Sequence, residues 1–294
     1  AGKDFGLISN PEFLQESRAI HDTIKPHVVV LGGYRTKFMK KTEKFFSRFN
    51  PNVPIIITNH QTAEMIKYAH NSFLSTKISF INQIANICQG IPDTNVDDVA
   101  NAIGLDPRIG NLFLNAGPGY GGSCLPKDIK AIINLSSKLG VNPTLLTAVE
   151  KINKQQISHI VTLVKQNIGK INGKKLTILG VAFKPGTDDI RNSVSIDLVK
   201  RLLKLGAKIT IHDPKALENA RKIFHDNTKY VKSVPSALKD CQCAIIMTQW
   251  KDYEKINNKT IKQMAKKFII DTRRVLYNKN LDAKYYAIGL GQKI

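Results

Sequence analysis

The sequence predicts an α/β protein with a doubly wound parallel sheet in its C-terminal part, a helical centre and part of a second α/β domain at the N-terminus. Two observations predict this fold class. Short apolar runs alternate with helical patterns near both ends of the chain, and a long stretch between them has helical periodicity without Gly or Pro. The length of 294 residues fits about two domains.

The first 58 residues have the pattern expected at the end of an α/β sheet. Apolar runs at 27–33 and 54–58 flank an amphipathic pattern at 36–49, which predicts a strand, a helix and a strand. Ahead of them, Glu12 and Glu16 in NPEFLQES are expected on the first turn of a helix, either as caps or as acid/base groups.

The centre of the chain, 59–169, is predicted to be helical. Apolar positions recur at helical spacing from Thr62 to Gln89, which predicts one long helix, and further helices are expected at 96–103 and 144–166. On the long helix, Lys67 and Asn71 are four residues apart and share a face. They can donate to a developing oxyanion or position a water; a solvated lysine beside a polar neighbour is the alternative.

The C-terminal part, 170–294, is predicted to be a Rossmann-like domain. Strands expected at 176–183 and 207–214 flank a helix at 193–206, which makes a βαβ unit; strands at 243–248, 268–272 and 285–289, with a helix at 256–266, continue the alternation. KPGTDDIR follows the first strand, where such sheets bind phosphates or sugars. Asp213 ends the second strand and is expected either to accept from ribose hydroxyls or to form a turn.

A glycine-rich loop, GPGYGGSCLPKD at 117–128, opens another predicted helix. It satisfies G-x-G-x-x-G, but no strand precedes it, so we expect the glycines to let backbone N–H groups approach an anion or a substrate. Cys124 falls at the start of the helix beside Lys127, and both features favour a thiolate nucleophile. A small residue packed against the helix is the alternative.

Composition excludes several classes of protein. The apolar runs are too short to span a membrane, no signal peptide is visible, and four cysteines without zinc-ligand spacing predict a reducing, cytoplasmic location with no metal. There are 44 Lys+Arg against 23 Asp+Glu, a net charge of +21 that invites a nucleic-acid hypothesis. The lysines are dispersed over helical patterns, however, so solvated helix faces are expected instead, without a nucleic-acid or membrane partner.

Taken together, the strings resemble the UDP-glucose/GDP-mannose dehydrogenase family. They are NPEFLQES, TAEMIKYAHNSFLSTKISFINQIAN, GLDPRIG, AGPGYGGSCLPKD, LGVAFKPGTDDIRNS and DTRRVL, in family order. The resemblance implies a remnant of an NAD-binding domain at 1–58, a dimerisation and catalytic region at 59–169 and a UDP-sugar-binding domain at 170–294. It also implies oxidation of the C6 alcohol of UDP-glucose to UDP-glucuronate in two NAD-dependent steps, with GDP-mannose or a UDP-N-acetylhexosamine as alternative substrates.

The resemblance further implies a role for each candidate residue. Cys124 would be the nucleophile that forms a thiohemiacetal and then a thioester, with Lys67 and Asn71 at the reacting oxygen. The other catalytic candidates are Asp128, Glu12 and Glu16. The implied substrate contacts are Phe113, Asn115, Gly117, Tyr120, Gly121, Phe183, Lys184 and Arg273, with Arg108 offered to a neighbouring subunit; the implied NAD contacts are Glu16, Lys127 and Arg191.

One departure from the family pattern concerns the N-terminus. The family begins with a strand and G-x-G-x-x-G upstream of its NPEF string, whereas this chain starts near NPEF. A separate chain supplying the N-terminal half of the NAD-binding domain is therefore one expected partner, beside a second copy in a homodimer. A subunit that only binds a nucleotide sugar or dimerises is the alternative function. The 6-phosphogluconate and β-hydroxyacid dehydrogenases share Lys-x-x-x-Asn on a long helix but lack the catalytic Cys.

Overall fold

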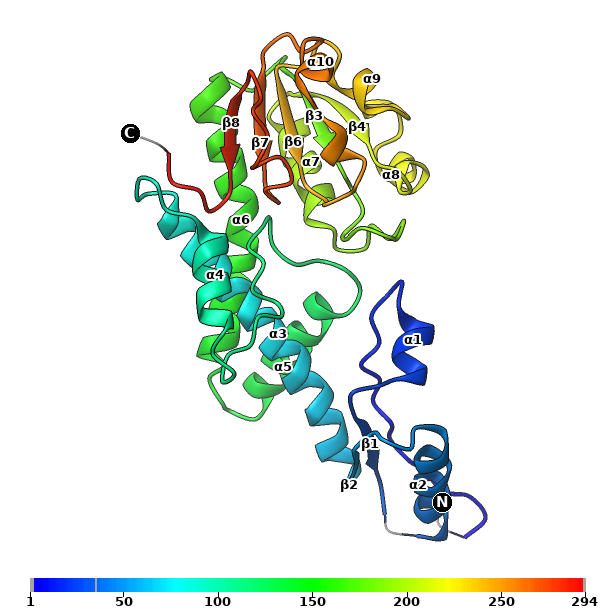
Figure 1. Cartoon of the computed structure of the whole chain (residues 1–294). Helices are drawn as coiled ribbons and strands as arrows, with labels where there is room; N and C mark the ends of the chain where they lie inside the picture. Colours follow the sequence, from blue (N-terminus) through cyan, green and yellow to red (C-terminus); the bar gives the residue numbers. More distant parts are fainter. Residues whose placement is uncertain (1–2, 35, 293–294) are drawn as a thin grey trace. The chain divides into compact units, whose positions relative to one another are not determined.

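The computed structural model describes residues 3–34 and 36–292 and divides the chain into two compact units, 1–73 and 74–294 (Figure 1). None of the helices in the described part of the chain is long and apolar enough to cross a membrane. Both units contain parallel strands with helices, so the predicted α/β fold class is confirmed.

The first unit contains a two-stranded parallel sheet, in which Val29 pairs with Ile55. Its core gathers around Val29, Leu31 and Met39. The elements are α1 (Ala19–Ile24), β1 (Val29–Gly32), α2 (Lys37–Phe49), β2 (Ile55–Thr58) and the start of α3 (His60–Cys88). The strand–helix–strand prediction is therefore confirmed.

The predicted helix at Glu12 and Glu16 is wrong, because α1 begins only at Ala19. The carboxylate of Glu12 instead accepts a hydrogen bond from the backbone N–H of Leu14 at 2.6 Å. A carboxylate that bonds a backbone N–H two residues ahead holds the chain in a turn that competes with a helix.

Helices form the first half of the second unit. α3 extends from the first unit to Cys88 without a break, as its unbroken apolar periodicity predicts. It is followed by α4 (Val96–Gly104), α5 (Leu125–Lys138) and α6 (Thr144–Ile168). The side chain of Asn95 caps α4 by accepting from the N–H of Asp97, which explains where that helix begins.

The second half is a six-stranded, fully parallel sheet with the order β5-β4-β3-β6-β7-β8 (Figure 1). Strands β6 and β7 are buried along their whole length, as expected for a parallel sheet covered on both faces. The strands are β3 (Lys175–Leu179), β4 (Lys208–His212), β5 (Thr228–Tyr230), β6 (Cys243–Ile246), β7 (Phe268–Asp271) and β8 (Lys284–Ala287). The helices between them are α7 (Val194–Lys204), α8 (Leu217–Phe224), η1 (His225–Asn227), α9 (Val234–Leu238), η2 (Tyr253–Lys255) and α10 (Asn258–Ile261).

The helix predicted at 256–266 is largely wrong. A capping box between Asn257 and Thr260 starts α10, which lasts a single turn. Beyond it, the carbonyl of Gln263 accepts from the N–H of Asp240, and the N–H of Ala265 donates to the carbonyl of Cys241. Tertiary hydrogen bonds therefore take the backbone groups that a longer helix would have used.

Candidate active site

Cys124 stands at the N-cap of α5 and is exposed. The hydroxyl of Ser123 lies 3.5 Å from its Sγ, and the N–H of Asp128 closes the first turn on its carbonyl at 2.9 Å. The other cysteines are buried, and burial raises the pKa of the Cys241 thiol to about 11. Cys124 is thus the one exposed thiol in the described part of the chain, which favours the nucleophile over the packed residue.

The first turn of α5 also carries Lys127 and Asp128. Asp128 is buried, and its Oδ1 accepts from Nζ of Lys127 at 2.6 Å. The lysine side chain is 66% exposed, so it shields one side of the carboxylate from water while its own charge faces solvent. A buried carboxylate with this partner lies four residues after the exposed thiol.

The glycine loop is fixed at its start by two arginines and one asparagine. The N–H of Gly117 donates to Oδ1 of buried Asn82 on α3 at 2.7 Å. A Cβ at Gly117 would lie 2.6 Å from Nη1 of Arg273, so glycine is required for the guanidinium to approach the backbone this closely. Arg274 donates to the carbonyl of Ala116 at 3.0 Å and pairs with Asp97.

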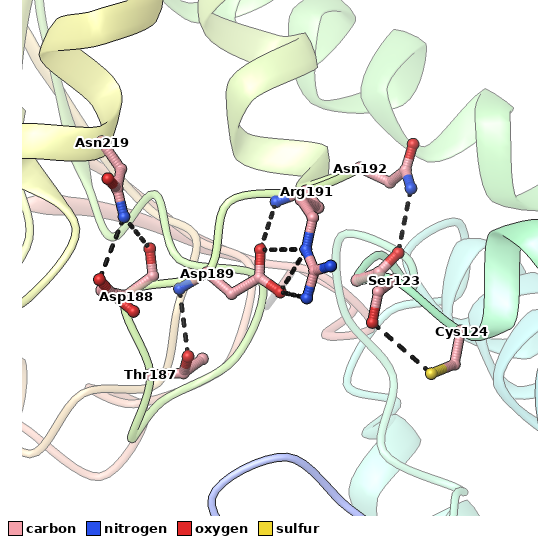
Figure 2. Close-up of polar contacts among 9 residues, drawn as sticks. Ser123, Cys124, Thr187, Asp188, Asp189, Arg191, Asn192 and Asn219 are labelled. Carbon is pink, nitrogen blue, oxygen red and sulfur yellow. Dashed lines mark hydrogen bonds and ion pairs between the residues drawn. The ribbon is translucent and has the colours of Figure 1, made fainter.

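The end of the loop is fixed by the segment after β3. The N–H of Gly122 donates to the carbonyl of Arg191 at 3.0 Å. The amide of Asn192, drawn in Figure 2, donates to the carbonyl of Gly122 at 3.1 Å. A Cβ at Gly122 would lie 2.8 Å from the ring of Phe183. The loop that carries Cys124 is therefore held against the carboxyl end of the second sheet.

The side chain of Arg191 has a defined orientation. Asp189 holds its guanidinium through two parallel hydrogen bonds, Nε to Oδ1 at 3.1 Å and Nη2 to Oδ2 at 2.7 Å, and Nε also donates to Oδ2 at 2.9 Å (Figure 2). The arginine side chain remains 67% exposed. Such a pair fixes a cation at the surface, where it can meet an anionic group.

A polar cavity of about 390 Å³ lies beside the loop in the second unit. Burial lowers the pKa of the Arg273 guanidinium, and the positive charge of Arg274 lowers it further, to about 10. Two neighbouring guanidinium groups in a partly buried site favour an anionic ligand. The lining residues are Asp97, Ala100, Asn101, Asn115, Ala116, Gln249, Arg273 and Arg274.

The other residues predicted to contact the substrate differ in how exposed their side chains are. Asn115 is exposed, and Phe113 is half-buried with a positive φ of 65°. The ring of Tyr120 packs with Ile129 and Val149, and burial raises its pKa to about 12, so the Tyr120 side chain belongs to the core. Gly121 packs against the carbonyl of Asn192. Nζ of Lys184 lies 5.6 Å from the centre of the Phe183 ring. The side chain of Arg108 is 87% exposed and forms a salt bridge with Asp106.

Four predicted catalytic residues belong to the first unit. Nζ of Lys67 donates to Oε1 of Glu12 at 3.1 Å and also to its backbone carbonyl. The same ammonium lies 5.4 Å from the centre of the Phe13 ring. Asn71 is buried and Glu16 is half-buried. The structure thus brings Lys67 and Glu12 together within one unit.

Three residues that organise the loop escaped the sequence-based predictions. Asn82 carried a usable signal, because it is a polar residue among the apolar positions of a predicted buried helix face. The side chain of Asn153 accepts from the N–H of Tyr120 and donates to its carbonyl, and Arg274 donates to the carbonyl of Ala116. Neither residue carried a signal in the local sequence pattern. Within the described residues, no three His, Cys, Asp or Glu side chains gather to hold a metal ion.

This fold defines a class of proteins, those built from parallel α/β sheets of the nucleotide-binding kind and a helical region. Comparison with known sequences assigns the chain within that class. Residues 1–50, 61–155 and 177–278 match the NAD binding domain, the central domain and the UDP binding domain of the UDP-glucose/GDP-mannose dehydrogenase family. The match at 1–50 supports NAD as the cofactor, as predicted.

Individual relatives agree with these matches. The UDP-glucose 6-dehydrogenase of Rickettsia conorii is 40% identical over 98% of this chain and 68% of its own length. For UDP-glucose 6-dehydrogenase TuaD of Bacillus subtilis the identity is 39%, over 97% of this chain and 62% of the relative. The solved structure of a UDP-glucose dehydrogenase from Pyrobaculum islandicum is 33% identical with a TM-score of 0.88, covering 97% of this chain and 64% of that one.

The chain therefore belongs to the UDP-glucose/GDP-mannose dehydrogenase family, as its sequence motifs predicted. It spans about two thirds of the length of its curated relatives, between 62% and 68% for the two named above.

Proposed function

We propose that this chain acts in the NAD-dependent oxidation of UDP-glucose to UDP-glucuronate. The observation that carries the proposal is the exposed thiol of Cys124 at the start of α5, on a loop that Arg274 and Asn192 hold against the UDP-binding sheet. Substrate identity is supported by the names of the relatives, which are UDP-glucose dehydrogenases at up to 40% identity.

In this proposal Cys124 is the nucleophile of the second oxidation. Its sulfur forms a bond to C6 of the aldehyde while the carbonyl oxygen takes up a proton, which gives a thiohemiacetal. NAD, when bound, supplies the hydride acceptor for both oxidations. Loss of a hydride from C6 and a proton from its hydroxyl converts the thiohemiacetal into a thioester, which water cleaves to release the carboxylate and restore the thiol.

The surrounding polar groups handle oxygen and protons. Lys67 and Asn71 donate to the oxyanion that develops at C6, and Asp128 serves in proton handling. Glu12 orients the hydrolytic water. The contact between Lys67 and Glu12 supports this assignment, because it places the ammonium donor beside the carboxylate acceptor.

Most cofactor and nucleotide contacts are assigned to cations of the second unit, and the exceptions are Glu16 of the first unit and the ring of Phe183. Arg191 is an exposed cation whose orientation Asp189 fixes, and such a group suits the pyrophosphate of NAD. Lys127 is a second exposed cation held by a carboxylate. Glu16 is proposed to lie at the nicotinamide end. Arg273 lines the polar cavity, which fits the phosphates of UDP, and Phe183 and Lys184 would meet the base and ribose.

We further infer a homodimer. Phe80 and Ile87 are 49% and 54% exposed and lie seven residues apart on α3, so they form an apolar stripe along one face of the helix. Arg108, which is 87% exposed, would reach the substrate of the second copy. Light scattering should give the mass of two chains, and a monomeric mass would contradict this part of the proposal. The four free cysteines fit a cytoplasmic location.

Replacing Cys124 by Ser tests the catalytic proposal. NADH formation with UDP-glucose, measured for the chain alone and with a polypeptide carrying the remaining part of the NAD binding domain, should fall by about a thousandfold or more. Cys88→Ser, at a buried thiol, is the matched control and should retain turnover. Unchanged turnover in Cys124→Ser would overturn the thioester route. Wild-type activity with GDP-mannose but not with UDP-glucose would overturn the substrate.

A further inference from the structure

The two residues before Phe183 are held by side chains from three other elements. Oδ2 of Asp213, directly after β4, accepts the N–H groups of Val181 at 2.7 Å and Ala182 at 3.0 Å. The carbonyl of Val181 accepts from the hydroxyl of Ser193 at 2.7 Å. All of these groups are buried, so each bond forms in the absence of competing water.

The remaining carbonyl of this dipeptide is bound by the end of β6. The hydroxyl of Thr248 donates to the carbonyl of Ala182 at 2.7 Å. Nε1 of Trp250, two residues after Thr248, donates to Oδ2 of Asp213 at 3.2 Å, which joins the segments that follow β4 and β6. Every backbone polar group of Val181 and Ala182 is thus satisfied by a side chain.

The second oxygen of Asp213 is also occupied. Oδ1 accepts the N–H groups of Lys215 and Ala216, each at 2.9 Å. The carboxylate therefore accepts five hydrogen bonds from the chain itself. A ribose would have to displace these donors, so of the two roles considered for Asp213 the structure favours the turn.

We propose that Asp213 is a positioning residue for the nucleotide site. By fixing the backbone of 181 and 182, it sets the direction in which Phe183 and Lys184 leave the sheet. The ring of Phe183 then packs on Gly122, which continues into Ser123 and Cys124. This inference rests on the proposed function, because it assumes that Phe183 and Lys184 contact the nucleotide.

Asp213→Asn tests the inference directly. The amide places a donor opposite two of the N–H groups, so the dipeptide loses part of its support. Titration of the whole chain with UDP should give a dissociation constant raised by about tenfold or more. Trp250 is the single tryptophan of the chain and bonds Asp213, so its fluorescence reports whether the loop geometry has changed.

A second pair of variants separates positioning from stability. Thr248→Val removes the hydroxyl that holds Ala182, while Thr177→Val removes an equivalent buried hydroxyl bond, at 2.6 Å to the carbonyl of Ala237. Both changes preserve shape and delete one bond, so their melting temperatures should fall alike. Only Thr248→Val should weaken UDP binding, by about threefold to tenfold.

The outcomes are distinguishable. If the wild-type chain binds UDP and both Asp213→Asn and Thr248→Val bind it with the same affinity, the positioning role is overturned. The proposed function is then unaffected. Equal loss of affinity in Thr177→Val and Thr248→Val also overturns it, because the effect would then follow stability alone. A wild-type chain that does not bind UDP overturns the proposed nucleotide site and this inference with it.

Discussion

The two units contain the same kinds of element but bury them very differently. The sheet of the first unit has two strands, and its core forms around three buried residues, Val29, Leu31 and Met39. Phe45 and Phe49 on α2 remain 58% and 48% exposed. The second unit has six strands, a large core that extends from α3 to the end of β8, and a smaller buried cluster around Tyr120, Ile129 and Val149. Because burial of apolar area drives folding, the second unit is expected to supply most of the stability.

The functional side chains follow the same division. In the first unit, Lys67 and Glu12 form a salt bridge, and the side chain of Glu12 is 53% exposed. Salt bridges exposed to water contribute little stability. In the second unit, the loop of Cys124 is held by buried hydrogen bonds, for example from Gly117 to Asn82. The comparison teaches that preorganisation for chemistry depends on how much core lies beneath the site.

The largest effect is expected from a core truncation in the second unit. Leu202 on α7 is fully buried, and Leu202→Ala should lower the free energy of unfolding of this unit by about 3 kcal/mol through lost burial and the cavity that remains. Chemical denaturation followed by Trp250 fluorescence measures it, because the single tryptophan lies in the same core.

Leu31→Ala is the matched change in the first unit, since Leu31 is also fully buried. If each unit unfolds on its own core, this variant should leave the Trp250 transition unmoved. A common shift of the transition in both variants would break the comparison, because it would show one cooperative structure.

A smaller effect is expected from acid. Burial lowers the pKa of His212, although Asp213 opposes the shift. The unfolded chain therefore binds the proton more tightly, so stability is full above pH of about 6.5 and is lost as the pH falls through the lowered pKa. The free energy of unfolding, measured by Trp250 fluorescence at a series of pH values, should decrease as the pH falls below about 6.5. The substitution His212→Gln should reduce this decrease.

A histidine of the first unit is the control for this experiment. Burial, with His27 and Lys67, lowers the pKa of His70 as well. His70→Gln should leave the pH dependence of the Trp250 transition unchanged. The assignment to His212 fails if the two variants flatten the profile equally.

The smallest effect is expected at a surface ion pair of the second unit. Lys154 bonds Glu150 at 2.9 Å across one turn of α6, with the lysine 67% exposed. Lys154→Ala should cost about 0.3–0.5 kcal/mol of unfolding free energy relative to Lys151→Ala. Lys151 is exposed on the same helix and forms no ion pair with any side chain that the structure describes. A difference as large as the effect of Leu202→Ala would show that surface charges matter as much to this unit as its core.

Much of the fold could be predicted because local periodicity reports burial. The apolar spacing after Thr62 predicted α3 nearly to the residue, and alternating short runs predicted the parallel sheet. The strand expected at 176–183 ends earlier, at Leu179, because Gly180 has a positive φ of 95° and a Cβ there would lie 2.5 Å from Thr248. That close approach involves a residue 68 positions away and leaves no mark on the local pattern.

The family, the order of the elements and the start of α5 after Cys124 can be inferred from the sequence, since motifs and helix signals are contiguous in the chain. Long-range packing sets how the glycine loop is held, which role Asp213 plays and where the chain after Asn257 leaves the helix. The physical reason is that hydrogen bonds are short and directional. Their partners are chosen by the packing of distant segments, as when Arg274 meets Ala116, 158 residues away.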